Sequence, residues 1–326
     1  MEVLTASAGS YPKISDDPKA INLRRELNLF DRGEIGWEEL ELAYKETIRR
    51  VLKEQEEAGL DILTDGQIRW DDLVTPFAKK MDGVEIGGLI RFFDNNFYYR
   101  QPVLVGPVRL REPATVNDFR FASSLTKRPM KAVIPGPYTM ARLCRDNYYK
   151  DLERLTLELA RALRDEALAL KEAGATILQI DEPSLCFNPE DAELAKEGIK
   201  IITDGLTLEV ALCLYFGSIK GLLGKLSHFP VQVLILDLVS RGENLEELFR
   251  SKVPQGLGLG LIDARNTKME RREDIIEILR RVSKAYPDRS PLYLTPNCGL
   301  EFLPHREAFK KMQLMVSIAR RFNEGL

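Results

Sequence analysis

Two cysteines and an aspartate follow apolar runs at comparable places along this chain. Cys213 lies at the end of LEVALCL, Asp237 lies in VLILDLV, and Cys298 directly follows PLYLTPN. Two thiolates and a carboxylate are donors that suit a zinc ion, and a bound zinc ion would activate a substrate thiol. The alternative is that both cysteines are core thiols, because free cysteine is among the most buried residue types.

A second set of polar residues suits the two charged groups of an amino acid. Asp181 and Glu182 come directly after the apolar run ILQI, and Pro183 then ends that run. An anion there suits a substrate ammonium group, whereas Gly9 and Ser10 offer a flexible backbone and a hydroxyl for a carboxylate. Taken singly, each of these residues is more simply explained as a turn or cap that ends a strand.

Short apolar runs, which end near these residues, alternate regularly with amphipathic helical stretches. Helical periodicity is clearest over residues 37–59 and 151–174, and both stretches stop at glycine. The apolar runs predict strands at 3–10, 61–66, 131–137, 176–183, 208–214, 233–239, 256–262 and 292–297. Such alternation indicates parallel strands joined by crossover helices.

Eight such units predict an α/β fold of the (β/α)8 TIM-barrel type, as a single domain over residues 1–326. The carboxyl ends of barrel strands meet at one mouth, so the polar residues above are expected to face one cavity. A doubly wound open sheet is the alternative, but the sequence has no GxGxxG motif to support it. The stretch 83–111 breaks the rhythm and predicts an antiparallel hairpin insertion, with its turn at residues 94–96.

Composition excludes several classes of protein. The 326 residues are 44% hydrophobic and 30% charged, with a formal net charge of -3, which argues against a nucleic-acid partner. No apolar stretch is long enough to span a membrane, and the N-terminus lacks the pattern of a signal peptide. Four dispersed cysteines are not a secreted disulfide framework. We therefore expect a cytoplasmic protein with reduced thiols and no membrane partner.

Six segments in order resemble the catalytic domain of cobalamin-independent methionine synthase, in its short core form. They are AGSYP, DGQIRWDDLVTPFAKKMDG, PGPYTMAR, LQIDEPSL, GLGLIDARNTKME and TPNCGLEFLP. The resemblance covers nearly the whole chain and implies a methyltransferase of methionine biosynthesis. It also implies a zinc cofactor, held by the His and Cys of an HxC element, a Glu after the next strand and a Cys in PxCG. That zinc binds homocysteine as the thiolate that accepts the methyl group.

The metal ligands that the resemblance implies are matched only in part. Cys298 matches the Cys of PxCG, Cys213 matches the Cys of HxC, and Asp237 stands in place of the Glu. The position of the His is Ala211, so water, a substrate thiolate or a neighbouring side chain would have to complete the site. The two histidines, His228 and His305, lie elsewhere in the sequence and are interpreted as structural.

Two further positions depart from the family pattern. Gln67 stands where the family has a Glu that helps to bind the substrate ammonium group, although Asp181 is retained. Arg265 stands where the folate-dependent enzymes have a His that protonates the leaving nitrogen. Arginine is a poor general acid and a good anion clamp. Gly9, Ser10, Gln67 and Asp181 are thus the predicted substrate-binding residues, and Asp181 and Arg265 the predicted catalytic ones.

Three hypotheses follow for the function. The first is methyl transfer to homocysteine, with a corrinoid or a methyl-folate as donor. The second is another zinc-thiol reaction of the same superfamily, which forms or cleaves a thioether on a different thiol. The third is a metal-free subunit that pairs with a second, homologous barrel, and the loss of the family His at Ala211 favours it.

Overall fold

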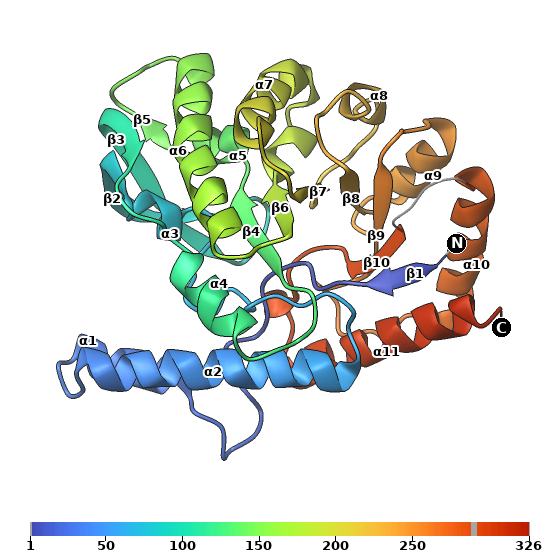
Figure 1. Ribbon diagram of the computed structural model, residues 1–326, viewed down its shortest axis with the longest axis horizontal. Coiled ribbons are helices and arrows are strands. Elements are labelled where there is room, and N and C mark those ends of the chain that lie inside the picture. The colour runs from blue at the N-terminus through green and yellow to red at the C-terminus, as the bar shows by residue number, and fades with distance from the viewer. Residues whose placement is uncertain (1, 288–291, 326) are drawn as a thin grey trace. The chain divides into compact units, whose positions relative to one another are not determined.

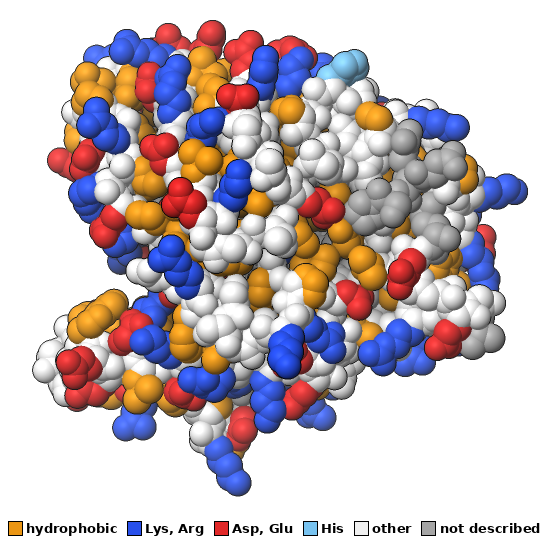
Figure 2. Space-filling model, in the orientation of Figure 1, with side chains coloured by type: hydrophobic (Ala, Val, Ile, Leu, Met, Phe, Trp, Pro, Cys, Tyr) orange, Lys and Arg blue, Asp and Glu red, His pale blue; other side chains and the backbone are white. Residues whose placement is uncertain are grey.

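The computed structural model describes residues 2–287 and 292–325, which form two compact units. Unit 1 comprises Met1–Arg69, Phe121–Met130 and Leu259–Leu326, and unit 2 comprises Trp70–Arg120 and Lys131–Gly258. Each unit is therefore assembled from segments that are distant in the sequence. On the face drawn in Figure 2, basic and acidic side chains are interspersed, in keeping with the small net charge of -3.

Unit 2 is built on parallel strands that occur in the order β4-β6-β7-β8. The strands are β4 (Lys131–Pro135), β6 (Ile177–Asp181), β7 (Glu209–Leu214) and β8 (Val233–Asp237). The first residues of β9 (Gly256–Ile262) continue this sheet, because the Gly256 N–H donates to the Gln232 carbonyl at 2.9 Å. The register pairs Pro135 with Asp181 and Asp181 with Cys213.

Residues paired in register point to the same face of a sheet, and neighbours along a strand point to opposite faces. One face of the unit 2 strands is consequently all apolar, with Ala132, Ile134, Leu178, Ile180, Val210, Leu212, Leu234 and Leu236. The opposite face, here called the inner face, carries polar residues: Lys131, Gln179, Asp181, Cys213 and Asp237. We therefore expect the apolar face to form packing contacts and the inner face to carry the functional residues.

Helices follow the unit 2 strands in sequence, and Figure 1 shows α6 and α7 lying side by side along them. The helices are α5 (Pro137–Leu143), α6 (Leu152–Glu172), α7 (Ala192–Thr203), α8 (Leu223–Leu226) and α9 (Gly242–Arg250), with short 3-10 turns η1 (Pro183–Cys186) and η2 (Pro189–Asp191). The helix predicted over 151–174 is confirmed as α6, which begins after the side-chain cap of Asp151.

The predicted insertion is confirmed as a small mixed sheet in unit 2. Strands β2 (Met81–Arg91) and β3 (Tyr98–Leu110) pair antiparallel, and β5 (Arg145–Asp146) adds to β3 in parallel. A register shift at Gly83, where φ is 75°, brings its backbone so close that a Cβ would lie 2.3 Å from the Pro107 carbonyl oxygen. Only glycine fits such a bulge. Helices α3 (Thr75–Ala78) and α4 (Val116–Ser123) flank the hairpin in sequence.

In unit 1, strand β1 (Val3–Thr5) pairs in parallel with β10 (Leu292–Pro296), which is followed by the 3-10 turn η3 (Leu300–Phe302). Its helices are α1 (Leu23–Asp31), α2 (Trp37–Ala58), α10 (Arg272–Ala285) and α11 (His305–Asn323), and α2 and α11 contact each other (Figure 1). Helix α2 confirms the prediction over 37–59 and ends at Gly59, where φ is 91°. The Asn323 side chain bonds both the N–H and the carbonyl of Val3, so the end of α11 holds β1 in place.

The strand predicted at 61–66 forms only isolated bridges, from Ile62 to Ala6 and from Leu63 to Met130. Its backbone groups are satisfied elsewhere, because the Gln55 side chain accepts from the Thr64 N–H at 3.1 Å and donates to the Thr64 carbonyl at 2.8 Å. An α/β fold with parallel strands and a small mixed sheet is thus confirmed. Closure into an eight-stranded barrel and organisation as one domain stay predictions. None of the described helices is long and apolar enough to cross a membrane.

Candidate active site

The inner face of unit 2 carries a chain of buried hydrogen bonds that ends at Asp181. The Lys131 ammonium donates to Gln179 Oε1, and Gln179 Nε2 donates to Asp181 Oδ1 at 2.6 Å. The Tyr215 hydroxyl donates to Asp181 Oδ2 at 3.1 Å. Each oxygen of the Asp181 carboxylate therefore accepts a hydrogen bond from the protein, and a carboxylate keeps further lone pairs for a ligand.

Burial changes the protonation of both ends of this chain. It raises the pKa of Asp181 to about 7, although the bonds from Gln179 and Tyr215 and the charge of Lys131 oppose the rise. It lowers the pKa of Lys131 to about 8 against the attraction of nearby acidic groups. Desolvation disfavours the charged form of each group, which is why the two values approach each other. A bound ammonium group would favour the Asp181 carboxylate in its ionised form.

The Glu182 side chain points away from the hydrogen bonds of Lys131, Gln179 and Asp181, because neighbouring residues of an extended segment point to opposite faces. Its Oε1 accepts from the Thr139 N–H at the start of α5, and its Oε2 has no hydrogen-bond partner among the described residues. A Cβ on Gly136 would lie 2.0 Å from Oε2, so the carboxyl group packs directly on the backbone of Gly136. Burial raises the pKa of Glu182 to about 8. Glu182 therefore holds the start of α5, and of the two adjacent carboxylates only Asp181 lies on the inner face.

Cys213 and Asp237 occupy the ends of the neighbouring strands β7 and β8, and both lie on the inner face. Both residues are buried. The Asp237 carboxylate accepts three backbone N–H groups, from Phe216 at 3.0 Å, Val239 at 3.0 Å and Ser240 at 2.9 Å. These bonds fix the carboxylate at the strand end. Unit 2 thus brings together three of the predicted site residues, namely Asp181, Cys213 and Asp237.

Ala211 lies on the same face as Cys213 and pairs with Gln179 on one side and Val233 on the other. Its methyl group supplies no metal donor. His228 is exposed after α8 and lies 3.0 Å from the Ser227 hydroxyl, while His305 begins α11 in unit 1 and contacts Glu54. Among the residues that the structure describes, no group of three or more His, Cys, Asp or Glu side chains is arranged to hold a metal ion.

In unit 1 the structure brings Gly9, Ser10 and Gln67 together. A Cβ on Gly9, where φ is +138°, would lie 2.9 Å from Gln67 Nε2, so only glycine allows this approach. Gln67 itself has a left-handed backbone with φ 52°. The Ser10 hydroxyl packs against Gly299, the residue after Cys298, and the Ser10 carbonyl accepts the Leu300 N–H at 2.9 Å. Cys298 is therefore attached to the same turn that contacts Ser10.

Arg265 lies in unit 1 on an exposed loop after β9, where its N–H donates to Asp263 Oδ1 at 2.9 Å. A buried lysine on α11 supports this loop. The Lys311 ammonium donates to the Asp263 carbonyl at 2.7 Å and to Glu270 Oε1 at 2.6 Å. Arg265 thus extends from a loop whose two ends are anchored, which suits a residue that binds an anion.

The family model for "Cobalamin-independent synthase, Catalytic domain" matches residues 3–321. The chain belongs to this family. It is 31% identical over 324 residues to the methionine synthase of Saccharolobus solfataricus, and the match covers 99% of this chain and 95% of that protein. It is 32% identical over 323 residues to the methionine synthase of Sulfurisphaera tokodaii, with 99% and 93% covered.

Solved structures of this cobalamin-independent synthase family have the same fold. A B12-independent methionine synthase from Shewanella sp. W3-18-1, in complex with selenomethionine, matches with a TM-score of 0.84 and 25% identity over 100% of this chain and 99% of that one. A protein from Listeria monocytogenes matches with a TM-score of 0.76 at 22% identity. The chain is therefore a member of a family of methionine-synthase-like methyltransferases.

Sequence reasoning missed three residues of the inner face of this family member: Lys131, Gln179 and Tyr215. The first two carried a signal, because Lys131 begins the apolar strand KAVIP and Gln179 interrupts the apolar strand ILQID, both with the same parity as Asp181. A polar residue inside a fully buried strand needs a partner. Tyr215 gave no such signal, since an aromatic residue after an apolar run predicts core packing equally well.

An aromatic cluster at the carboxyl ends of the unit 2 strands was also missed. Phe93, at the hairpin turn, stacks on Phe187 at 5.3 Å between ring centroids and contacts Phe216 at 5.7 Å. Phe93 and Phe216 both have left-handed backbones, with φ 50° and 72°. That conformation costs a non-glycine residue about 1 kcal/mol or more. The Phe216 N–H donates to the Asp237 carboxylate. The hydroxyl of the preceding residue, Tyr215, donates to Asp181, so two consecutive residues contact two carboxylates of the site.

Proposed function

We propose that this protein transfers a methyl group to the sulfur of homocysteine and so forms methionine. The observation that carries the proposal is Asp181, a carboxylate fixed by buried hydrogen bonds on the same face as Cys213 and Asp237. Membership of the family supports it. So does the Shewanella methionine synthase, whose structure is a complex with selenomethionine, the selenium analogue of the proposed product.

In this proposal Asp181, Gln67, Gly9 and Ser10 bind the amino acid. Asp181 pairs with the substrate ammonium group, and Gln67 accepts a hydrogen bond from it without adding charge. Gly9 and Ser10 bind the substrate carboxylate through backbone and hydroxyl groups. Alignment of the sulfur with the methyl donor lowers the activation barrier by several kcal/mol. A bond forms between sulfur and the methyl carbon, and the bond from that carbon to the donor breaks with its electron pair left on the donor. The thiol loses its proton to solvent, and a methyl-folate donor takes up one proton from solvent at the nitrogen that loses the methyl group.

The residues that suit a zinc ion are Cys213, Asp237 and Cys298. The donor set fits zinc chemically, and two of its members end adjacent strands on one face of unit 2. A bound zinc ion supplies the positive charge that lowers the pKa of a substrate thiol. Because Ala211 contributes no ligand, the substrate thiolate itself would complete the coordination in this proposal.

The methyl donor is a methyl-folate or a corrinoid. Arginine is a poor general acid and binds anions well, so Arg265 serves as an anion clamp for the donor in this proposal. We also propose that the strands of the chain close into a single (β/α)8 barrel domain, with one mouth that holds all of these residues. A cytoplasmic location agrees with reduced thiols at Cys213 and Cys298.

Two alternatives have specific support. Gln67 in place of an acidic residue favours a thiol other than homocysteine, in a thioether-forming or thioether-cleaving reaction. Ala211 favours a metal-free subunit that acts with a second homologous barrel. Thermal-shift measurements with a panel of thiols distinguish the first alternative from the main proposal. If the first alternative holds, another thiol stabilises the protein and homocysteine does not.

Metal content and methionine formation test the main proposal together. We expect near-stoichiometric zinc in the wild type, its loss in Cys213→Ser and Cys298→Ser, and its retention in the control Cys144→Ser. We also expect methionine from homocysteine with methylcobalamin or a methyl-folate. Failure to take up added zinc would favour the partner-subunit alternative. Absence of methionine with both donors would contradict the proposed reaction.

A further inference from the structure

We propose that Lys131 is a positioning residue for the amino group of the substrate, acting on Asp181 through Gln179. The inference rests on the proposed function, because it concerns the same amino-acid site. Lys131 lies at the beginning of β4 and pairs with Ile177, whereas Asp181 lies four residues further along β6. Four residues of a strand span about 13 Å, which is longer than a lysine side chain. Besides its direct electrostatic attraction, the Lys131 ammonium therefore acts on Asp181 through the intervening amide of Gln179.

The ammonium of Lys131 decides which way the Gln179 amide points. Lysine has only donors, so the Gln179 atom that it contacts must be the carbonyl oxygen. The amide nitrogen is then directed to Asp181 Oδ1, at 2.6 Å. Together with Tyr215 on Oδ2, this bond fixes the plane of the carboxylate. A fixed carboxylate presents its remaining lone pairs in one direction, which favours a ligand ammonium placed there.

Loss of the lysine ammonium would remove this control. In Lys131→Met the Gln179 carbonyl oxygen loses the ammonium hydrogen bond that favours its present orientation, so the turned orientation of the amide becomes less unfavourable. A turned amide would direct its carbonyl oxygen at Asp181, where two acceptors repel. The consequence is specific: ligands that carry an ammonium group lose affinity, whereas ligands that lack it do not depend on the orientation of Asp181.

The test compares two ligands on each variant by isothermal titration calorimetry. The ligands are L-methionine and 4-(methylthio)butanoic acid, which is methionine without its amino group. In Lys131→Met we expect the affinity for L-methionine to fall about tenfold, the effect of one buried charge-assisted hydrogen bond. The affinity for the deaminated ligand should change less than twofold. Lys171→Met, on α6 of the same unit, is the matched control and should leave both affinities unchanged.

A second variant keeps the test decisive if Lys131→Met folds poorly. Gln179→Glu retains an acceptor for the Lys131 ammonium but cannot donate to Asp181, so it should show the same selective loss. An equal loss for both ligands, or no loss in either variant, would show a merely structural role and overturn the inference. A wild type that binds neither L-methionine nor homocysteine would instead overturn the proposed function, and this inference with it.

Discussion

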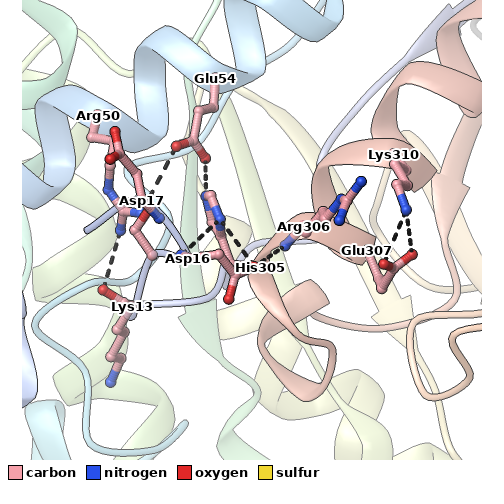
Figure 3. Close-up of polar contacts among 10 residues, drawn as sticks. Lys13, Asp16, Asp17, Arg50, Glu54, His305, Arg306, Glu307 and Lys310 are labelled. Carbon is pink, nitrogen blue, oxygen red and sulfur yellow. Dashed lines mark hydrogen bonds and ion pairs between the residues drawn. The ribbon is translucent and has the colours of Figure 1, made fainter. Parts of the chain in front are cut away.

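Two networks of charged side chains in this molecule differ in their relation to water. In unit 2, Lys131, Gln179 and Asp181 are 4%, 0% and 5% exposed. In unit 1, His305 Nε2 lies 2.8 Å from Glu54 Oε2 and its Nδ1 lies 3.7 Å from Asp16 Oδ2 (Figure 3). The side chains of His305, Glu54 and Asp16 are 13%, 15% and 60% exposed. The first network is closed to solvent, whereas the second reaches it.

The unit 1 network joins segments of the chain that are distant in sequence. Figure 3 shows Glu54 on α2, His305 at the start of α11, and Asp16 in the loop after β1. The Asp16 carboxylate also accepts the Arg306 N–H at 2.8 Å. Arg50 on α2 donates to the Lys13 carbonyl at 3.1 Å in the same loop. Solvent near such groups screens their charges, so these contacts hold the loop and two helices together at modest energy.

Burial distinguishes the charged groups of unit 2 from those of unit 1. Burial raises the pKa of Asp181 and lowers that of Lys131, and each shift is a free-energy difference between charge states. A ligand that supplies the missing counter-charge recovers part of that energy on binding. The unit 1 network reaches solvent through Asp16 and has less such energy to recover. We therefore expect substitutions in the unit 2 network to change ligand affinity strongly. Substitutions in the unit 1 network should change only the stability of the protein, and by a small amount.

The largest expected effect follows from neutralising the buried carboxylate. Asp181→Asn should weaken the binding of L-methionine by about 100-fold, because truncating one partner of a buried charge pair costs about 2–5 kcal/mol. The control Asp16→Asn neutralises a carboxylate of the unit 1 network and should change the affinity less than twofold. Calorimetric titration measures both, and a similar loss in the two variants would contradict the contrast drawn between the networks.

Glu182 should show the next largest effect, on stability. Its folded-state pKa, about 8, lies above its unfolded value near 4.5, so its contribution is fully present below about pH 4.5 and is lost as pH rises through 8. Glu182→Gln removes the titrating group. Between pH 6 and 9 the wild type should lose on the order of 2 kcal/mol more unfolding free energy than the variant.

Urea unfolding at the two pH values measures this difference. Glu57→Gln, on an exposed side chain of α2, is the control and should follow the wild type at both pH values. Parallel pH dependence of the wild type and Glu182→Gln would show that Glu182 is not protonated in the folded protein at pH 6.

The pH dependence of methionine binding should be smaller still. Because Asp181 must be ionised to pair with an ammonium group and its pKa is raised to about 7, affinity should fall as pH decreases below 7, by up to about tenfold per pH unit. Titrations between pH 8 and pH 5.5 measure the slope. Asp181→Asn should bind weakly with no such slope, and persistence of the slope in that variant would assign it to another group.

The smallest effect is expected in unit 1. His305→Ala removes the contacts to Glu54 and Asp16 and the edge of a ring contact with Tyr11, so the unfolding free energy should fall by about 1 kcal/mol. Methionine affinity should stay within twofold of the wild type. The exposed His228→Ala is the matched control, with a change below about 0.5 kcal/mol. Thermal unfolding and titration of the three proteins check both statements.

Much of the architecture was predictable because it depends on local periodicity. Helices α2 and α6 and the hairpin β2–β3 were expected nearly at their observed bounds. The segment 61–66 was not, because its alternation of apolar residues is that of a strand while the Gln55 side chain takes the backbone bonds that a neighbouring strand would have made. The periodicity of a segment does not show that a side chain of another element will take the place of a neighbouring strand, because that contact forms only in the tertiary structure.

Residue identity and order are sufficient to identify the family, the donor types and the departures at Ala211, Gln67 and Arg265. The tertiary fold places Asp181 on the inner face, whereas the next residue, Glu182, packs against the start of α5. It also decided that Lys131 reaches Asp181 through Gln179. The physical reason is that register and burial set which polar groups meet and how far their pKa values shift, and both arise only when distant strands pair.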